Sequence, residues 1–385
     1  VSLGVSVDIA PAAVAKARLV IAEVNPAMPC TMGHSMLHVD EIDWLVPIDT
    51  PVIEYQHDAL PGEVVEQIAR YISSIIDDGS TLQIGLGRVT NEALKYLADR
   101  SDLGIHSDVI TDAIIPLLER GILNGRRKTD QRGQIVTSFA MGSRRLYDLI
   151  DRNPLFSFQP IEQVCDPATL AAQHKMTSVT QAFAIDLSGQ VCSDQFEGQY
   201  YGGLSAQAEF LRGASRSPGG KPVICLASTT DDGATSRIRP TLLAGEGVSV
   251  ARSEVHYVIT EYGIAYLFGK SLRDRALMLI ELAHPKFRPS LLEQAKALGY
   301  LAADQELRSQ SPYRVEEERS LQLKDRRQVL LRPARASDAA GIRELFFKLP
   351  MDDVYTRFFR KKAIIRQSGA PPSIDTIAEA HAKPA

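Results

Sequence analysis

Residues 81–94 read TLQIGLGRVTNEAL and contain the strand, turn and helix on which the expected fold is built. The apolar run Thr81–Ile84 is short enough for a buried strand, and Gly85 and Gly87 are typical of a tight turn. The residues after Gly87 have the pattern of a helix start. The same order recurs over 135–150, where the run IVTSFA is followed by a glycine and a helix-like segment. Strands that alternate with helices predict a mainly parallel sheet covered on both faces.

The Gly85–Gly87 turn is also a candidate binding element. Free N–H groups at a turn and a helix N-terminus attract carbonyl or anionic oxygen. A turn that serves only packing is equally common for such a short motif.

His106, at the end of a further apolar run, is a candidate general base, although a hydrogen-bonded structural histidine is the commoner case.

A second informative stretch, 185–221, reads IDLSGQVCSDQFEGQYYGGLSAQAEFLRGASRSPGGK. Its candidate functional residues are the carboxylates Asp194 and Glu197, the glycines Gly202, Gly203, Gly219 and Gly220, and Lys221. A carboxylate between glycine bends suits nucleophilic catalysis, because glycine lets backbone N–H groups approach a developing oxyanion. A solvated surface loop gives the same pattern more often.

Two charged positions follow further along the chain. Arg237 and Arg239 adjoin a polar turn, where they either hold a substrate carboxylate or CoA phosphate or pair with Asp231 and Asp232. Glu261 follows the apolar run 255–260, and ligands gather at the carboxyl ends of strands in open α/β sheets. Bracing of the neighbouring loop is the alternative role for Glu261.

Composition narrows the function classes. Of the 385 residues, 44% are hydrophobic and 23% charged, as in an ordinary globular protein, and the net charge of -4 gives no electrostatic reason for nucleic-acid or membrane binding. The widely spaced cysteines predict free thiols in a reducing compartment and no zinc site, so we expect a cytoplasmic protein without a bound metal. The start VSLGVSVD lacks Met and resembles the middle of a strand, so we expect a fragment or a processed chain.

Several motifs together resemble the acetyl-CoA hydrolase/transferase family, which includes 4-hydroxybutyrate CoA-transferase. The likeness runs from Val1 to about Leu301. The motifs are DLSGQVCSD (186–194), FLRGA (210–214), STTDDGATSRIRP (228–240) and VITEYGIAYLFGKSLRDRALMLIELAHPKFR (258–288). In that family a glutamate occupies the position of Asp194, and the stretch after it is richer in glycine than 203–207 is here.

The resemblance implies two open α/β domains of the CoA-transferase (NagB/RpiA) type. Residues 1–153 would be the C-terminal part of the first domain, truncated at its N-terminus, and 154–301 the second domain. We expect a charged linker over 302–327. Residues 328–385 resemble the start of a GNAT-type N-acetyltransferase domain, with a strand from Gln328, a helix over 339–349 and a disordered tail. The phosphate-binding segment of that second family is absent, so we expect no acetyltransferase activity.

The resemblance also implies a reaction: acyl-CoA:carboxylate CoA-transfer, or acetyl-CoA hydrolysis when water intercepts an intermediate. A side-chain carboxylate would form an acyl anhydride and then an enzyme-CoA thioester, with no cofactor besides the CoA substrate. The expected partners are acyl-CoA and a short-chain acid, and a second copy of the chain. Register with the family favours Asp194 as the nucleophile over Glu197. The alternative is a catalytically silent acyl-CoA-binding module that regulates an attached acetyltransferase.

Overall fold

The computed structural model describes residues 1–55, 62–307, 318–325, 327–334 and 345. Contacts within the chain divide it into two compact units, Val1–Pro312 and Tyr313–Ala385. Each unit is described by itself.

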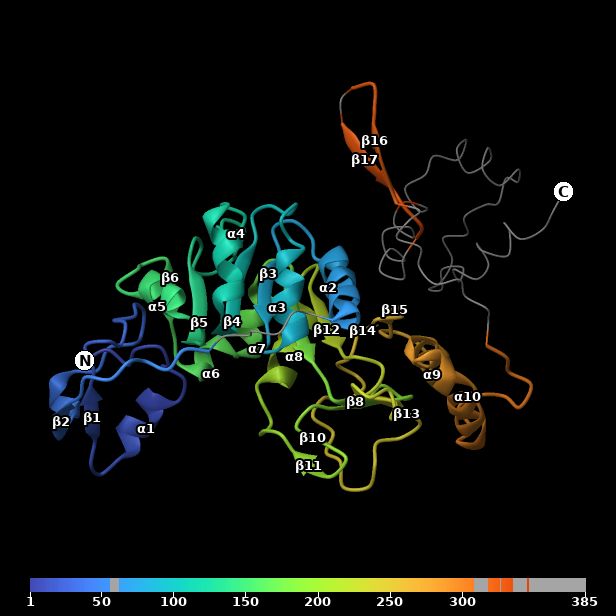
Figure 1. The fold of residues 1–385 in the computed structure, drawn as a ribbon, viewed down its shortest axis with the longest axis horizontal. Coiled ribbons are helices and arrows are strands. Elements are labelled where there is room, and N and C mark those ends of the chain that lie inside the picture. The colour runs from blue at the N-terminus through green and yellow to red at the C-terminus, as the bar shows by residue number, and fades with distance from the viewer. Residues whose placement is uncertain (56–61, 308–317, 326, 335–344, 346–385) are drawn as a thin grey trace. The chain divides into compact units, whose positions relative to one another are not determined.

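An eight-stranded sheet forms the centre of the first unit (Figure 1). Its order is β15-β14-β12-β7-β3-β4-β5-β6. Neighbouring strands run parallel, except that β15 is antiparallel to β14. The strands are β3 (Thr81–Ile84), β4 (Gly104–Ile110), β5 (Ile135–Ala140), β6 (Phe156–Phe158), β7 (Met176–Gln181), β12 (Lys221–Cys225), β14 (Tyr257–Thr260) and β15 (Gly263–Tyr266). The predicted mainly parallel sheet is confirmed.

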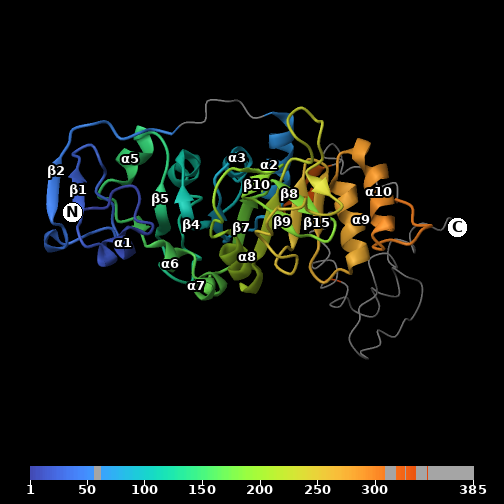
Figure 2. The ribbon, with the colours of Figure 1, turned by 90° about the horizontal axis from the view of Figure 1, so that it is seen from below.

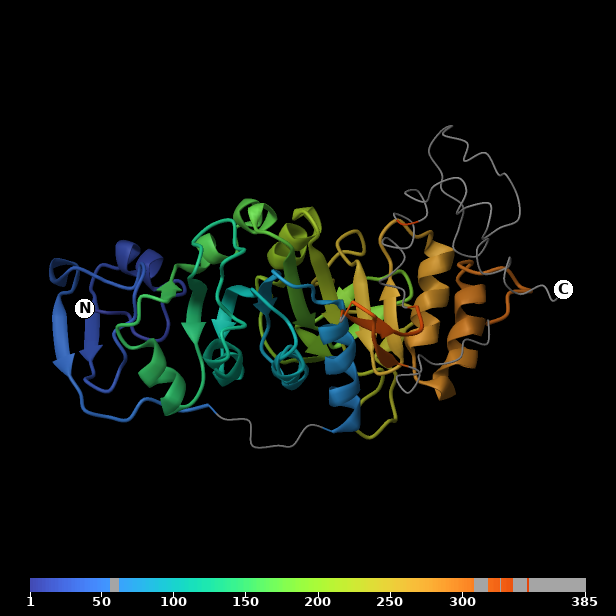
Figure 3. The same cartoon turned by 90° about the horizontal axis from the view of Figure 1, so that it is seen from above.

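Helices cover both faces of this sheet, as views along its edge show (Figures 2 and 3). One face carries α2 (Glu63–Ile75), α3 (Arg88–Lys95), α4 (Ile115–Glu119), α5 (Arg144–Ile150) and the short η2 (Asp112–Ile114); the other carries α6 (Ile161–Val164), α7 (Pro167–Ala172) and α8 (Gln207–Arg216). Helical spacing explains α2, whose Ile68, Ile72 and Ile75 are buried on one side. Beyond β15 lie α9 (Leu272–Leu282), η3 (Pro285–Phe287) and α10 (Arg288–Ala297).

The expected division between residues 153 and 154 does not appear as a break in the sheet. Strands β3 to β6 precede it, and β7, β12, β14 and β15 follow it. The two sets join where Thr81–Ile84 pairs with Met176–Val179 in parallel register. Residues 154–163, next to the expected boundary, contain β6 and the start of α6.

The N-terminal region differs from its prediction. No strand forms over Val1–Asp8, because Gly4 and Asp8 have left-handed φ angles of 67° and 37° that interrupt an extended backbone. The segment instead contacts β5, where Ala140 N–H donates to the Val5 carbonyl at 2.8 Å. After α1 (Ala10–Lys16), β1 (Ile21–Val24) and β2 (Trp44–Pro47) form a parallel pair outside the main sheet, with η1 (Val39–Glu41) between them. Ile21 of β1 is exposed.

Between β7 and β14 the chain builds a small layer that contains much of the second informative stretch. A three-stranded sheet has the order β13-β8-β9, from β13 (Ile238–Arg239), β8 (Ala184–Asp186) and β9 (Val191–Cys192). A hairpin follows β9, made of β10 (Gln195–Phe196) and β11 (Gln199–Tyr200). The small layer is anchored by apolar side chains such as Ile185, Leu187 and Val191, which are buried in one core with Leu279 and Ile280 of α9.

In the second unit, β16 (Arg319–Gln322) pairs antiparallel with β17 (Gln328–Leu331). The strand expected from Gln328 is confirmed, whereas β16 lies in the stretch expected to be linker. The expected helix over 339–349 falls outside the described residues except for Leu345, and the expected disordered tail falls outside them entirely. Among the described residues, no helix has the length and apolar character needed to cross a membrane.

Candidate active site

The carboxyl ends of the parallel strands meet at one edge of the main sheet. Gly85 follows β3, Gln181 ends β7, and Glu261 follows β14. Gly87 precedes α3 with a φ of 141°, and a Cβ there would lie 2.6 Å from Gln181 Oε1, so glycine is needed for close approach. The Gly85 N–H donates to the Val179 carbonyl at 3.0 Å. This N–H is therefore already bonded within the main chain, and a contact between the Gly85–Gly87 turn and a substrate oxyanion stays a prediction.

Glu261 has a bracing contact at this edge. One oxygen of its carboxylate accepts the Ser228 N–H at 3.0 Å, and the other accepts the Ser228 hydroxyl. These bonds hold the loop after β12, as the structural alternative predicted. A direct role with substrate stays a prediction.

Asp194 lies just beyond β9 and is only 9% exposed. Its Oδ1 is 3.4 Å from both the Cys192 thiol and the Ser249 hydroxyl, and its main-chain carbonyl accepts the Tyr201 N–H at 2.9 Å. Gly247 faces the other oxygen: a Cβ there would lie 3.8 Å from Asp194 Oδ2. In the described part of the chain, no ion pair involves Asp194. The carboxylate is thus shielded but held only by long contacts.

A relay of hydrogen bonds ties this carboxylate to the edge of the main sheet. The Gln181 carbonyl, at the end of β7, accepts from Gln207 Nε2 at 3.2 Å. Gln207 Oε1 accepts the Ser193 hydroxyl at 2.5 Å, and Ser193 N–H donates to Ser249 Oγ at 2.7 Å. Ser249 then faces Asp194. The three linking side chains, which are Gln207, Ser193 and Ser249, were not identified from the sequence. Ser249 lies 55 residues from Asp194 in the chain, and a contact over such a separation leaves no local sequence pattern.

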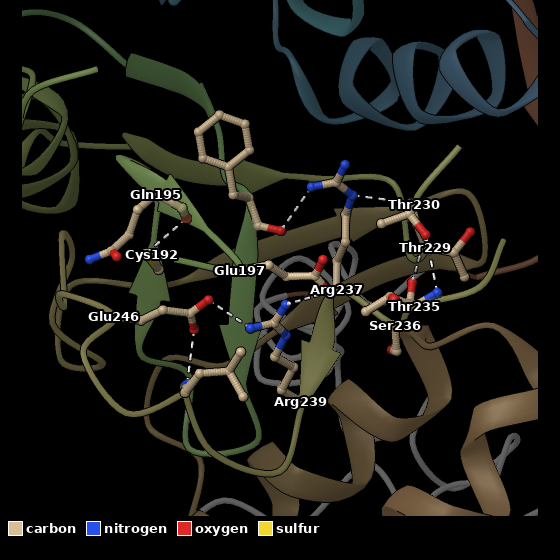
Figure 4. Close-up of polar contacts among 12 residues, drawn as sticks. Cys192, Gln195, Glu197, Thr229, Thr230, Thr235, Ser236, Arg237, Arg239 and Glu246 are labelled. Carbon is tan, nitrogen blue, oxygen red and sulfur yellow. Dashed lines mark hydrogen bonds and ion pairs between the residues drawn. The ribbon is translucent and has the colours of Figure 1, made fainter. Parts of the chain in front are cut away.

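Glu197 lies in the two-residue turn between β10 and β11 (Figure 4). Its φ is +50° and that of Gly198 is +81°, the two positive values of a type I′ turn. The side chain is 51% exposed, and Oε1 lies 3.8 Å from Arg239 Nη2. Arg239 also pairs with the buried Glu246 at 2.7 Å. The two candidate nucleophiles therefore differ: Asp194 is shielded without a cation, whereas Glu197 is half exposed beside one.

Arg237 is held by backbone rather than by the acids expected to pair with it. Its Nε donates to the Thr229 carbonyl and its Nη1 to the Phe183 carbonyl, both at 3.1 Å. Burial lowers the pKa of Arg237, and the neighbouring charge of Asp231 partly offsets this effect. Among the described residues, no ion pair joins Arg237 to Asp231 or Asp232, so that predicted pairing is wrong.

Three predicted residues lie at the opposite edge of the sheet. Gly219 and Gly220 precede β12, and Lys221 is its first residue. Lys221 Nζ contacts Asp77 Oδ2 at 2.5 Å and the Ile75 carbonyl at 2.6 Å. A Cβ at Gly220 would overlap the Ala214 carbonyl oxygen, so this glycine serves packing. These residues therefore lie at the amino end of β12, because α8 carries the chain back to the amino ends of the strands, and their contact with CoA stays a prediction.

Gly202 and Gly203 lie in an exposed loop, with no atom within 4 Å of a Cβ built on either. Tyr201, which bonds the Asp194 carbonyl, places the loop next to that residue's backbone. Their contact with substrate stays a prediction.

His106 is a structural residue in the interior. Its Nε2 lies 2.9 Å from the Val164 carbonyl, and burial lowers its pKa to about 4. These contacts agree with the second role considered for His106, that of a hydrogen-bonded structural histidine. Across the described residues, no group of three or more His, Cys, Asp or Glu side chains is arranged to hold a metal ion.

Sequence comparison relates the chain to CoA-transferases. The acetyl-CoA hydrolase/transferase C-terminal domain family matches residues 142–295. Over 295 residues the chain is 42% identical to 4-hydroxybutyrate coenzyme A transferase of Clostridium kluyveri, an alignment that covers 77% of this chain and 68% of that protein. It is 38% identical to succinyl-CoA:cyclohexane-1-carboxylate CoA transferase of Geobacter metallireducens, covering 74% and 65%.

Solved structures give the same relation. RipA from Yersinia pestis superposes with a TM-score of 0.74 at 36% identity, covering 78% of this chain and 68% of that one. A 4-hydroxybutyrate CoA-transferase from Porphyromonas gingivalis gives 0.68 at 36% identity, covering 77% and 71%. The chain therefore spans about two thirds of the length of these relatives.

Proposed function

The chain belongs to the acetyl-CoA hydrolase/transferase family as an enzyme of the CoA-transferase type, and from this premise we propose that it moves CoA between an acyl-CoA and a short-chain carboxylic acid through Asp194. The observation that carries this proposal is the burial of the Asp194 side chain together with the small number of its contacts. It is shielded at the carboxyl edge of the sheet, and only a thiol and a hydroxyl contact its reacting oxygen, each at 3.4 Å. A carboxylate without a counter-ion keeps its nucleophilicity, because no strong bond has to break before it attacks.

In the proposed reaction CoA is transferred in two pairs of acyl-transfer steps, so that a thioester is present again at the end. Asp194 attacks the thioester carbonyl, the C–S bond breaks, and CoA leaves as a thiolate, so that a mixed anhydride between the acyl group and Asp194 remains. The thiolate attacks the Asp194 carbonyl carbon and releases the donor acid, which leaves an enzyme-CoA thioester. The acceptor acid repeats the two steps in reverse and departs as acyl-CoA. Water in place of the acceptor gives hydrolysis.

Oxyanions develop at each attack, and fixed donors nearby would stabilise them. The Gly85 N–H is excluded by its bond to Val179. The backbone at Gly87, at the start of α3, and the Gly202–Gly203 loop remain the candidates from this chain. Cys192 and Ser249 would orient Asp194 rather than react, because each contacts its carboxylate.

The side-chain length favours a second candidate function, an acyl-CoA-binding module with little or no transfer. Aspartate has one methylene fewer than the glutamate that the family resemblance implies, a difference of about 1.5 Å in reach. A misplacement of ~1 Å can lower a rate about a hundredfold. The layer that carries Asp194 must advance by that amount for transfer to be efficient.

Isotope exchange between acetyl-CoA and labelled acetate separates the two. The chain as described is incubated with both, and label in acetyl-CoA is measured alongside acetyl-CoA binding. Exchange that Asp194→Asn abolishes supports the transferase. Tight binding without exchange supports the silent module and contradicts the proposal.

A further inference from the structure

A compact charged cluster, formed by the hairpin that follows Asp194 and by residues 237–246, has no part in the reaction steps above; Figure 4 shows its charged side chains. We call it the Glu197 cluster: Phe196, Glu197, Arg237, Arg239 and Glu246. The two guanidinium groups contact Phe196, with centres 4.7 and 4.6 Å from its ring. The side chains of Arg239 and Glu246 are 7% and 2% exposed, so this pair is buried.

Among the residues that the structure describes, one nitrogen of the buried guanidinium has no hydrogen-bond partner. Arg239 Nη1 lies 2.7 Å from Glu246 Oε1, whereas Nη2 is buried without an acceptor in hydrogen-bonding range. A carboxylate oxygen of Glu197 lies 3.8 Å from this nitrogen, outside hydrogen-bonding range. A buried donor left without an acceptor destabilises the fold, so the position is suited to a second carboxylate oxygen.

The charge count of the cluster leads to the same conclusion. Arg237 and Arg239 bring two positive charges, and the buried Glu246 brings one negative charge. Arg237 donates hydrogen bonds to the Thr229 and Phe183 carbonyls, and the charge of Asp231 acts on it without an ion pair. Without Glu197, Glu246 would be the one carboxylate among the described residues that is ion-paired with this cluster.

Glu197 is an unusual residue for its turn. Both central positions of a type I′ turn need positive φ, which glycine and asparagine adopt readily and glutamate does not. A residue that breaks a local rule without a packing gain is a candidate for function. Its ion pair with Arg239 is long, at 3.8 Å, and half exposed on the Glu197 side, so it is weak. Glu197 is thus a strained carboxylate placed next to an unsatisfied cation.

We propose that Arg239, with Arg237, forms a carboxylate subsite that Glu197 fills in the free chain. The ligand of this subsite is the distal carboxylate of a small dicarboxylic acid. That this subsite determines which acid the enzyme accepts rests on the proposed CoA-transferase function. Gly247 faces the Asp194 carboxylate, and the adjacent Glu246 holds Arg239, so the two ends of one acid would address neighbouring groups.

The subsite makes Glu197 a selector against dicarboxylic acids. A dicarboxylate must displace Glu197 from Arg239, whereas a monocarboxylate needs no such displacement. An attached carboxylate competes at a high effective concentration, although its exposed ion pair limits the effect.

The test measures binding of succinate and butyrate without CoA, by isothermal titration and ligand-observed NMR, so that no turnover is involved. Glu197→Gln should bind succinate about fivefold more tightly than the natural chain does, because an exposed ion pair no longer competes. Butyrate binding should stay unchanged. Glu293→Gln, which removes an exposed acid paired with Lys296 on α10, is the matched control and should change neither.

The role of the arginine is tested in a triple variant, Glu197→Gln with Arg239→Met and Glu246→Met. Removing both buried partners avoids an isolated buried charge, and thermal unfolding checks that the variant folds. It should lose the gain in succinate binding. An unchanged succinate affinity in Glu197→Gln, an equal gain for butyrate, or a gain that survives the loss of Arg239 would overturn the subsite. Absence of CoA exchange in the natural chain would overturn the proposed function alone.

Discussion

At the scale of single residues, the surroundings of Asp194 and Glu197 assign them different tasks. Asp194 is 9% exposed with two long contacts, whereas Glu197 is half exposed and faces an arginine. A nucleophile must leave bulk water and keep its lone pairs available, and only Asp194 meets both conditions.

Asp194→Glu tests the cost of the short side chain. The added methylene advances the carboxylate by about 1.5 Å, and we expect the CoA-exchange rate to rise about tenfold or more. The measurement is kcat/KM for exchange of label between acetate and acetyl-CoA. A lower rate in Asp194→Glu would mean that the backbone already places the shorter acid correctly.

His106 makes stability depend on pH. Burial lowers its folded pKa to about 4, below the ordinary value of 6.5, so the folded chain prefers the neutral ring. As pH falls from about 6.5 towards about 4, the unfolded chain binds a proton that the folded chain refuses. Stability should therefore fall by up to about 3 kcal/mol across this window, and be unaffected by His106 above it.

Chemical denaturation at pH 6.5 and 4.5 measures this dependence. His106→Gln should remove most of the loss, whereas His38→Gln, at a site 71% exposed, should leave it as in the natural chain. Identical pH slopes in the natural chain and His106→Gln would refute the assignment.

Residue roles could be predicted only where a position and its partner are close in sequence. Asp194 and Glu197 were both identified as candidates from their glycine-flanked stretch. Their different environments depend on Ser249, Gly247 and Arg239, which lie some 40 to 55 residues later in the chain. No local pattern predicts such contacts.

At the scale of elements, one turn holds the layer that carries Asp194. Gly189 joins β8 to β9 with a φ of +94°. Arg275 on α9 reaches it, and donates to the carbonyls of Ser188 at 2.7 Å and Leu267 at 3.1 Å. The turn is thus fastened to a helix 80 or more residues away in the chain.

Gly189→Ala should lower the free energy of unfolding by about 2–3 kcal/mol. The new Cβ would overlap the Arg275 guanidinium, and alanine is strained at this φ. Thermal or urea unfolding measures the change. Gly202→Ala is the control and should have little effect on unfolding, because open space surrounds that position.

Elements themselves could be predicted where alternation or helical spacing is strong. The strand at Thr81–Ile84 and the helix α2 follow from such patterns. The strand expected over Val1–Asp8 does not form, since Gly4 and Asp8 turn the backbone. The glycines before Lys221 were placed at the site by their nearness to Asp194 in sequence, and α8 separates them in space.

At the scale of the whole molecule, pairing between distant strands defines the architecture. Strands from both sides of residue 153 form one sheet, joined where β3 pairs with β7. Parallel strands have no hairpin to specify their neighbour, so this order does not follow from periodicity. Family resemblance predicted the type of fold but not the continuity of the sheet.

The first compact unit contains every candidate site residue of this chain. A chain that ends after Pro312 should therefore keep the exchange activity and thermal midpoint of the 385-residue chain. Loss of exchange with an unchanged midpoint would show that the following residues take part in the reaction.

The central claim is that Asp194 carries the acyl group and then CoA. Borohydride reduces an enzyme-CoA thioester to a stable alcohol, so incubation with acetyl-CoA followed by borohydride traps the intermediate at its attachment site. Mass spectrometry should find the reduced residue at 194, Asp194→Asn should abolish trapping, and Glu197→Gln should retain it. Trapping at 197, lost in Glu197→Gln and kept in Asp194→Asn, would contradict the account.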